Sequence, residues 1–400
     1  MSPRPPRRSP AGPRGVLLLA VLGLCACPRA KDPDDDFRRQ LLASVANNVV
    51  LPTYTEFASR TASLKTATAS LANAAAAGEA PVEQAAAQAA WAAAMGTWQR
   101  AELLQLGPAG APAVMTGGES RRDRLYSWPT VSPCRVDQEL VAQGYQAPTF
   151  FETALVNLYG LDALEYLLFH TGPENQCPST DALNATGTWA ALTADELRIR
   201  RAAYADAVAG QLQRDADALL AAWSPAGGNF AQLLSTAGTE GSPFGTAQEA
   251  LDQVFAAMFY VDLTVKDAKL AVPAGLNIAC TGTTCPQAVE SRWAHRSKEQ
   301  LVENLQGFRL LFSGGDQLGF DDFLIRRNAS DLSTQVLQAA DAAVVALEAI
   351  PGTLEVAVDA NPAQVAAAYD AVKALTDLVK TQFVTVLNLR VPQEGAADND

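Results

Sequence analysis

The chain has 400 residues, of which 48% are hydrophobic and 18% charged, and its formal net charge is −13 at pH 7. This length exceeds the usual size of one hydrophobic core, which predicts two domains of ordinary size. The acidic charge argues against a nucleic acid as partner, because binding to phosphates requires an excess of lysine and arginine.

The first residues have the pattern of a secretory signal. Four arginines precede the apolar run 16–24, which is too short to span a bilayer. The run ends in 24–27, Leu-Cys-Ala-Cys, which resembles a bacterial lipobox with Cys27 as the lipidated residue; ordinary cleavage after a small residue is the alternative. We therefore predict a signal peptide over 1–26, an acidic tether over 27–36, and a lipid anchor that holds the protein at a membrane of the cell envelope, periplasmic or on the outer-membrane surface.

Helical periodicity covers most of the remaining chain, so we predict an all-α protein with two helical bundles joined near residue 190. The first domain would span 37–190 and the second 191–394, followed by a flexible tail over 395–400. Residues 107–148 are rich in glycine and proline and predict a long irregular connection. Strand-like alternation is limited to 385–391. The expected helices are 37–77 with a kink or break at Pro52, 81–105, 153–169, 194–223, 244–269, 296–312, 329–350 and 361–385.

The predicted helix 153–169 carries only two charges, Asp162 and Glu165, which are three residues apart. At 100° per residue both fall on the apolar stripe of this helix, so both carboxylates should face the core. A buried carboxylate requires a cation, a hydrogen-bond donor or a metal. An ion pair and a metal site therefore both stay open, and the arginines available in the irregular connection are Arg121, Arg122 and Arg124.

Four cysteines lie beyond residue 27, and an even number in an exported protein indicates disulfides. We expect Cys134 to pair with Cys177, around the acidic helix, and Cys280 with Cys285. A four-cysteine zinc site is the rival, but structural zinc prefers two closely spaced pairs of ligands.

A zinc peptidase of familiar design is not supported by the histidines. The chain contains two, His170 and His295, and neither belongs to an H-E-x-x-H pair. We expect His170 to cap its helix or face solvent, whereas His295 is a weaker ligand candidate. No G-x-S-x-G elbow or glycine-rich phosphate loop is present in the sequence.

A series of short fragments occurs in an order that resembles the imelysin-like family of bacterial envelope proteins, from roughly residue 41 to residue 392. No fragment is specific alone, but their order is. The fragments are 48–54 with Phe57, Trp98, 107–108, 128–129, 160–168, 266–270 with Pro273, 290–291, 304–307, and Gly315 with 319–320.

The resemblance implies two four-helix-bundle-like domains with a pocket between them, lined by a G-x-H-x-x-E motif. Gly160 and Glu165 match this motif, but Asp162 stands in the place of the histidine. The family is described both as metallopeptidases and as envelope proteins of iron uptake. Carboxylate oxygens favour harder ions such as iron(III) or calcium, whereas histidine suits zinc. We therefore expect a metal at Asp162 and Glu165, with iron favoured and zinc or calcium still open.

Further ligands would have to come from other elements, and four acids lie in or beside the fragments that match the family. The leading hypothesis is a lipid-anchored protein that binds iron or an iron-bearing molecule in an inter-domain cleft, together with iron-uptake partner proteins. A metal-dependent peptidase with Glu165 as general base is the second, and a structural surface module with a degenerate site is the third; the residues favour binding over catalysis. The weaker ligand candidates are Glu56, Glu102, Asp267 and Glu290.

Overall fold

The computed structural model describes residues 1–2 and 32–392. The lipidation candidate Cys27, nearly all of the predicted signal peptide and the tail over 395–400 lie outside the described residues. Within the described part, none of the helices combines the length and the apolar character needed to cross a membrane.

The described residues contain helices and no strand, which confirms the predicted all-α class. The strand-like alternation over 385–391 was misleading, because a helical turn lies there. Three π-helical segments occur, at Val45–Val50, Val261–Ala271 and Val379–Phe383. The α-helices are α1 (Asp35–Ser44), α2 (Leu51–Ala77), α3 (Pro81–Ala101), α4 (Arg121–Leu125), α5 (Pro133–Ala142), α6 (Phe150–Thr153), α7 (Leu161–Phe169), α8 (Ala182–Ala185), α9 (Ala194–Trp223), α10 (Phe230–Ser235), α11 (Ala247–Met258), α12 (Ser297–Ser313), α13 (Phe320–Arg326), α14 (Ser330–Glu348), α15 (Leu354–Ala360), α16 (Pro362–Leu378) and α17 (Val384–Leu387).

The first long helix begins two residues earlier than predicted, at Asp35, and continues through Pro52 without a break. Proline has no N–H to donate, and the π-helical turn before it accommodates the altered hydrogen bonding. The acidic tether predicted over 27–36 therefore overlaps the folded body. Asp34 is buried there and forms ion pairs with Arg326 at 2.9 Å and Arg327 at 2.7 Å.

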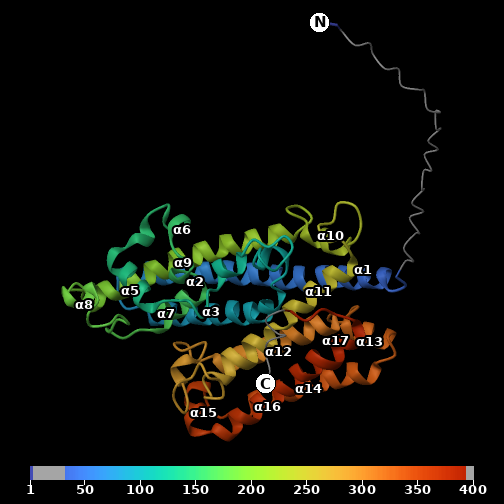
Figure 1. Ribbon diagram of the computed structural model, residues 1–400. Helices are drawn as coiled ribbons and strands as arrows, with labels where there is room; N and C mark the ends of the chain where they lie inside the picture. Colours follow the sequence, from blue (N-terminus) through green and yellow to red (C-terminus); the bar gives the residue numbers. More distant parts are fainter. Residues whose placement is uncertain (3–31, 393–400) are drawn as a thin grey trace. The chain divides into compact units, whose positions relative to one another are not determined.

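Two groups of helices pack against each other through α3 and α12 (Figure 1). The first group contains α2, α3, α7 and α9; the second contains α12, α14, α16 and the segment Val261–Ala271. Helix α9 follows the predicted boundary near residue 190 but packs along α2 and α7 of the first group. The domain division at residue 190 stays a prediction.

Close approach of α3 and α12 depends on a glycine. A Cβ atom placed on Gly307 would lie 2.5 Å from the carbonyl oxygen of Arg100, so no larger residue fits without a backbone shift. Aromatic anchors fill the neighbouring core: Trp98 packs against Phe57, and the indole N–H of Trp91 donates to the carbonyl of Leu161 at 2.7 Å.

Both expected disulfides are present. Cys134 at the start of α5 is bonded to Cys177, which lies in the loop after α7, and Cys280 is bonded to Cys285 in the loop before α12. The irregular connection over 107–148 is long, as predicted, but it contains the short helices α4 and α5.

Candidate functional site

Helix α7 holds both motif acids with their side chains buried, since Asp162 is 5% exposed and Glu165 is 3% exposed. The prediction that both carboxylates face the core is therefore confirmed. Gly160 precedes the helix with a φ of +99°, and a Cβ atom there would lie 3.0 Å from the carbonyl oxygen of Leu125. The glycine of the motif thus allows α7 to begin directly against the end of α4.

Asp162 is held by hydrogen-bond donors. Its Oδ2 atom accepts from the backbone N–H of Ser127 at 3.1 Å and from the Ser127 hydroxyl at 2.7 Å, and Oδ1 accepts from the N–H of Ala163 at 3.0 Å. Burial raises the pKa of Asp162 to about 6, because these bonds offset only part of the cost of removing the charge from water.

The alternative in which the motif acids form ion pairs with Arg121, Arg122 or Arg124 is not what the structure shows. Arg121 instead pairs with Glu119 at 2.6 Å. Similarly, Arg124 pairs with Asp215 at 2.9 Å. The third arginine, Arg122, forms an ion pair with another buried acid, Glu102. It does not contact Asp162, and its charge lowers the pKa of Asp162 only from a distance.

Glu165 binds the loop that precedes α12. Its Oε1 atom alone accepts three hydrogen bonds, from the hydroxyl of Ser291 at 3.0 Å and from the backbone N–H groups of Trp293 and Ala294, both at 2.9 Å. Burial raises the pKa of Glu165 to about 8, with a smaller contribution from the charge of Glu290. The carboxyl therefore fastens α7 to a segment more than 120 residues away in the chain.

A buried lysine lies beside these contacts, and sequence reasoning did not identify it. The Nζ atom of Lys269 is 2.8 Å from Glu102 Oε2 and 2.8 Å from Glu290 Oε1, and the side chain is fully buried. The ammonium also donates to Gln99 at 2.7 Å and to Asn304 at 3.0 Å. The available signal was its place between apolar residues in a fragment that matches the imelysin-like pattern.

The two glutamates around Lys269 have further partners. Glu102 accepts a hydrogen bond from Tyr260 and forms an ion pair with Arg122 at 3.2 Å. The charges of Lys269 and Arg122 hold the pKa of Glu102 below its ordinary value despite burial. Glu290 Oε1 accepts from Tyr126 at 2.7 Å, but Oε2 is buried without a hydrogen-bond partner among the described residues. Burial and the charge of Glu102 raise the pKa of Glu290.

Residues adjacent in the sequence connect the two motif acids to the partners of Lys269. Ser127, which binds Asp162, follows Tyr126, which binds Glu290; Ser291, which binds Glu165, follows Glu290 directly. We call the resulting set the buried carboxylate cluster. It contains the acids Asp162, Glu165, Glu102 and Glu290 and the cations Lys269 and Arg122, so formal negative charge exceeds positive charge.

The remaining candidates lie outside this cluster. Glu56 is partly exposed and pairs with Arg60 at 3.2 Å and with Arg100 at 3.4 Å, while Asp267 pairs with Lys266 at 2.9 Å. The imidazole of His295 is 61% exposed and 3.9 Å from the nearest glutamate oxygen.

His170 follows the last residue of α7, and its Nε2 atom lies 2.7 Å from the carbonyl oxygen of Glu174, as expected for a residue at the helix end. Among the described side chains, three potential ligand atoms gather within 4.8 Å of one another only at Cys134, Cys177 and Asp181. Both sulfurs of that group are bonded to each other, so they are not thiolate ligands.

The model of the imelysin family matches residues 50–382, which is most of the chain. The chain belongs to the imelysin family. Among solved structures, it is similar to an imelysin-like protein from Psychrobacter arcticum, with a TM-score of 0.64, 16% identity, and coverage of 91% of this chain and 100% of that chain. It is also similar to a Parabacteroides distasonis protein designated an iron-regulated protein A precursor, with a TM-score of 0.66, 18% identity, and coverage of 88% and 97%. No curated protein matches the chain.

Asp162 occupies the position where the motif implied by the resemblance to imelysin-like proteins has a histidine, and the two side chains differ in hydrogen bonding. An imidazole at this position offers one acceptor nitrogen at most, whereas Asp162 uses both oxygens, and Oδ2 accepts two hydrogen bonds from Ser127. The aspartate of this imelysin chain therefore keeps the turn before Pro129 attached to α7.

Proposed function

We propose that this imelysin-family chain is a cell-envelope protein of iron handling that binds a hard cation at the buried carboxylate cluster. The observation that carries the proposal is the excess of carboxylates over cations in the cluster, together with the unpaired Oε2 atom of Glu290. The family match and the similarity to a protein designated as iron-regulated support an iron-related role.

The donor set fits such a cation in its chemistry, because carboxylate and hydroxyl oxygens are the ligands that iron(III), manganese and calcium prefer. Glu290 would supply the first oxygen through Oε2, and Ser291, the residue after it, already donates to Glu165. When bound, the cation would supply the positive charge that the proton on Glu165 supplies at neutral pH, because the pKa of that carboxyl is raised to about 8.

Binding is favoured over peptide cleavage by the contacts of Glu165. A general base needs a free oxygen directed at a water molecule, but Glu165 Oε1 already accepts three hydrogen bonds from the 291–294 loop. Its role in this arrangement is to position that loop.

The envelope location belongs to the same proposal. Lipidation at Cys27 would hold the protein at a membrane, where a cation could pass to iron-uptake partner proteins. Mass spectrometry of the mature N-terminus tests this part, because lipidation predicts a diacylglyceryl mass on Cys27 that the Cys27→Ala variant lacks.

Equilibrium dialysis with elemental analysis tests the cation site. The protein is dialysed against iron(III) citrate, manganese(II), calcium or zinc, and is compared with the Glu165→Gln/Glu290→Gln double variant. We expect about one iron per chain in the wild type and at least tenfold weaker binding in the variant. The matched control is Glu56→Gln, a partly exposed acid outside the cluster, which should bind like the wild type.

Two outcomes would contradict the proposal. If the wild type binds none of these cations, or if the double variant and the Glu56→Gln control bind equally well, the carboxylate excess does not hold a cation. Zinc bound in place of iron, with peptide cleavage that Glu165→Gln removes, would establish the metallopeptidase alternative instead.

A further inference from the structure

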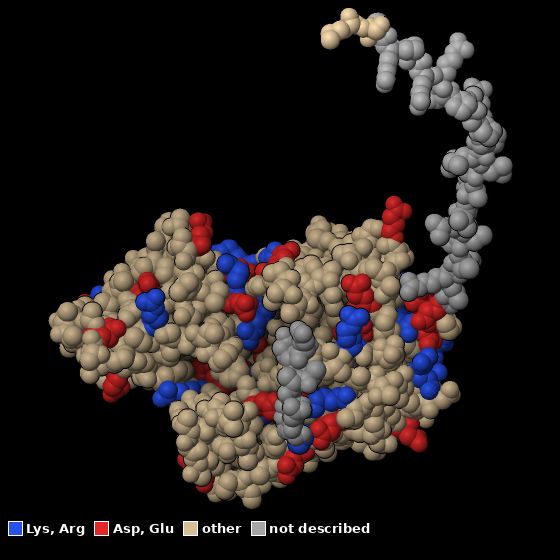
Figure 2. All heavy atoms as spheres, viewed as in Figure 1, with Lys and Arg blue, Asp and Glu red and all other residues tan. Residues whose placement is uncertain are grey.

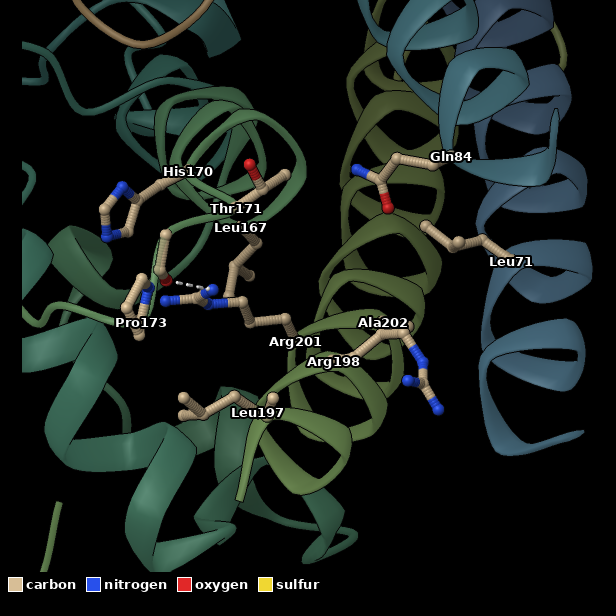
Figure 3. Close-up of a pocket in the computed structure, with 12 residues that line it drawn as sticks. Leu71, Gln84, Leu167, His170, Thr171, Pro173, Leu197, Arg198, Arg201 and Ala202 are labelled. Carbon is tan, nitrogen blue, oxygen red and sulfur yellow. Dashed lines mark hydrogen bonds between the residues drawn. The ribbon is translucent and has the colours of Figure 1, made fainter. Parts of the chain in front are cut away.

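A pocket of about 320 Å³ lies at the C-terminal end of α7, and none of its lining residues belongs to the carboxylate cluster (Figure 3). Its walls come from α2, α3, α9 and the 170–173 loop. Leu71, Leu167, Leu197 and Pro173 give it a largely apolar surface. A volume of this size suits a small organic molecule.

The polar side of the pocket is cationic. Arg201 and Arg198 line it, and the lining residues include no carboxylate, although the protein as a whole is acidic. On the molecular face drawn in Figure 2, blue and red side chains are interspersed. The lining of the pocket is therefore positively charged, whereas the net charge of the whole protein is negative.

Of the two arginines that line the pocket, Arg201 forms no ion pair with a described residue. It is 8% exposed, and its Nη1 atom donates to the carbonyl oxygen of Gly172 at 2.8 Å, as Figure 3 shows. Its Nη2 atom is buried without a hydrogen-bond partner among the described residues. Burial lowers the pKa of Arg201, because the charges of Asp137 and Glu174 offset only part of the cost of removing the guanidinium from water.

The charges of Asp137 and Glu174 act on this guanidinium, but neither carboxylate forms a hydrogen bond or an ion pair with it. The Asp137 carboxylate already accepts from the Tyr166 hydroxyl at 2.9 Å through both oxygens and from the N–H of Gln176 at 2.7 Å. By contrast, Arg198 is paired with Asp195 and donates to the carbonyl of Ala75 at 3.2 Å. A buried cation with an unused donor beside an apolar pocket is a binding position for an anion.

We propose that this pocket binds a small amphiphilic monocarboxylate, such as a medium-chain fatty acid, with its head group at Arg201 and its apolar body against Leu71, Leu167 and Leu197. One unused guanidinium nitrogen suits a single negative charge better than a phosphate dianion, which demands several donors. Arg201 lines the pocket and its Nη2 atom has no hydrogen-bond partner among the described residues, so this nitrogen is the donor assigned to the head group. This proposal does not rest on the proposed cation site.

Isothermal titration of the full chain with sodium decanoate tests the proposal, with 1-decanol and acetate as probes that retain only the tail or only the charge. We expect decanoate to bind at least tenfold more tightly than either probe. Arg201→Gln should weaken decanoate binding at least tenfold. Arg200→Gln is the matched control, because Arg200 lies on the same helix and donates to the carbonyl of Val141 but does not line the pocket.

A second variant keeps the proposal testable if Arg201→Gln fails to fold. Ala202→Leu retains the arginine but fills part of the pocket, so it should also weaken decanoate binding while circular dichroism shows an unchanged helical signal. Equal binding of decanoate and decanol, equal affinity of the Arg201 and Arg200 variants, or no decanoate binding by the wild type would overturn the proposal.

Discussion

Glu165 and Ser291 are 126 residues apart in the chain, yet the Ser291 hydroxyl donates to Glu165 Oε1 at 3.0 Å inside the protein. This bond, with the two backbone N–H groups beside it, joins the motif helix α7 to the loop that leads into α12. The same loop begins with Glu290, which contacts Lys269. The motif of the imelysin family therefore fixes the loop that presents a second acid.

The raised pKa of Glu165 predicts a stability that falls with increasing pH. Glu165 titrates at about 8 when folded and near its ordinary 4.5 when unfolded, so between these values the folded state holds a proton that the unfolded chain has released. The free energy of unfolding should then decrease with pH, by at most about 1.4 kcal/mol per pH unit, and level off above pH 8.

Urea unfolding between pH 6.5 and 8.5 measures this slope. The window lies above the pKa values of Asp162 and Asp137, which are raised to about 6, so the contribution of these two groups fades across it. Glu165→Gln should abolish the decline, because glutamine can still accept hydrogen bonds but does not titrate. A variant that retains the wild-type slope would show that another group causes it.

Replacing Lys269 by methionine should destabilise the protein by about 3–5 kcal/mol, because Glu102 and Glu290 would lose the ammonium that lies 2.8 Å from each. Arg60→Met is the comparison: it removes one cation from an exposed ion pair with Glu56 and should cost less than about 1 kcal/mol. Thermal and urea unfolding of both variants measure the difference. Similar losses would mean that the buried lysine contributes little.

Asp162→Ala should cost about 2–4 kcal/mol, since the buried N–H and hydroxyl of Ser127 would both lose their acceptor. Asp162→Asn should cost less, because the amide oxygen can still accept from Ser127. Asp341→Asn provides the control, as Asp341 is half exposed and pairs with Arg309 on the surface. If the alanine and asparagine variants unfold at the same urea concentration, the hydrogen bonds to Ser127 are not the stabilising contribution.

The two disulfides should differ in their contribution to stability. The chain-entropy relation gives about 4 kcal/mol for the Cys134–Cys177 bond and about 2 kcal/mol for Cys280–Cys285, because they span 43 and 5 residues. Paired cysteine-to-serine variants, unfolded in urea under non-reducing conditions, compare them. A larger loss from the Cys280–Cys285 pair would contradict the entropic explanation.

Local patterns in the sequence predicted the features that depend on nearby residues. The helices, both disulfides and the inward direction of Asp162 and Glu165 follow from periodicity, cysteine number and the position of acids on an apolar stripe. The partners of those acids could not be predicted from the sequence, because the connection offers both arginines and a serine at similar distances along the chain. In the structure, Asp162 binds Ser127 and not one of the arginines.

Lys269 was missed for a related reason. Its contacts with Gln99 and Glu102 join residues 170 and 167 positions apart, and helical periodicity cannot indicate which two helices cross. The apolar neighbours of Lys269 in the sequence are a weak signal of burial, but its partners follow only from the packing of the π-helical segment Val261–Ala271.

Gly307 controls the geometry of that ion network from outside it. It lies one turn beyond Asn304 on α12 and faces the backbone of Arg100, the residue after Gln99 on α3. Any side chain there would act as a wedge between the two helices and move the amide of Asn304 away from Gln99 and Lys269. The absence of a Cβ atom at Gly307 thus allows α3 and α12 to approach closely enough for Gln99 and Asn304 both to bind the ammonium group of Lys269.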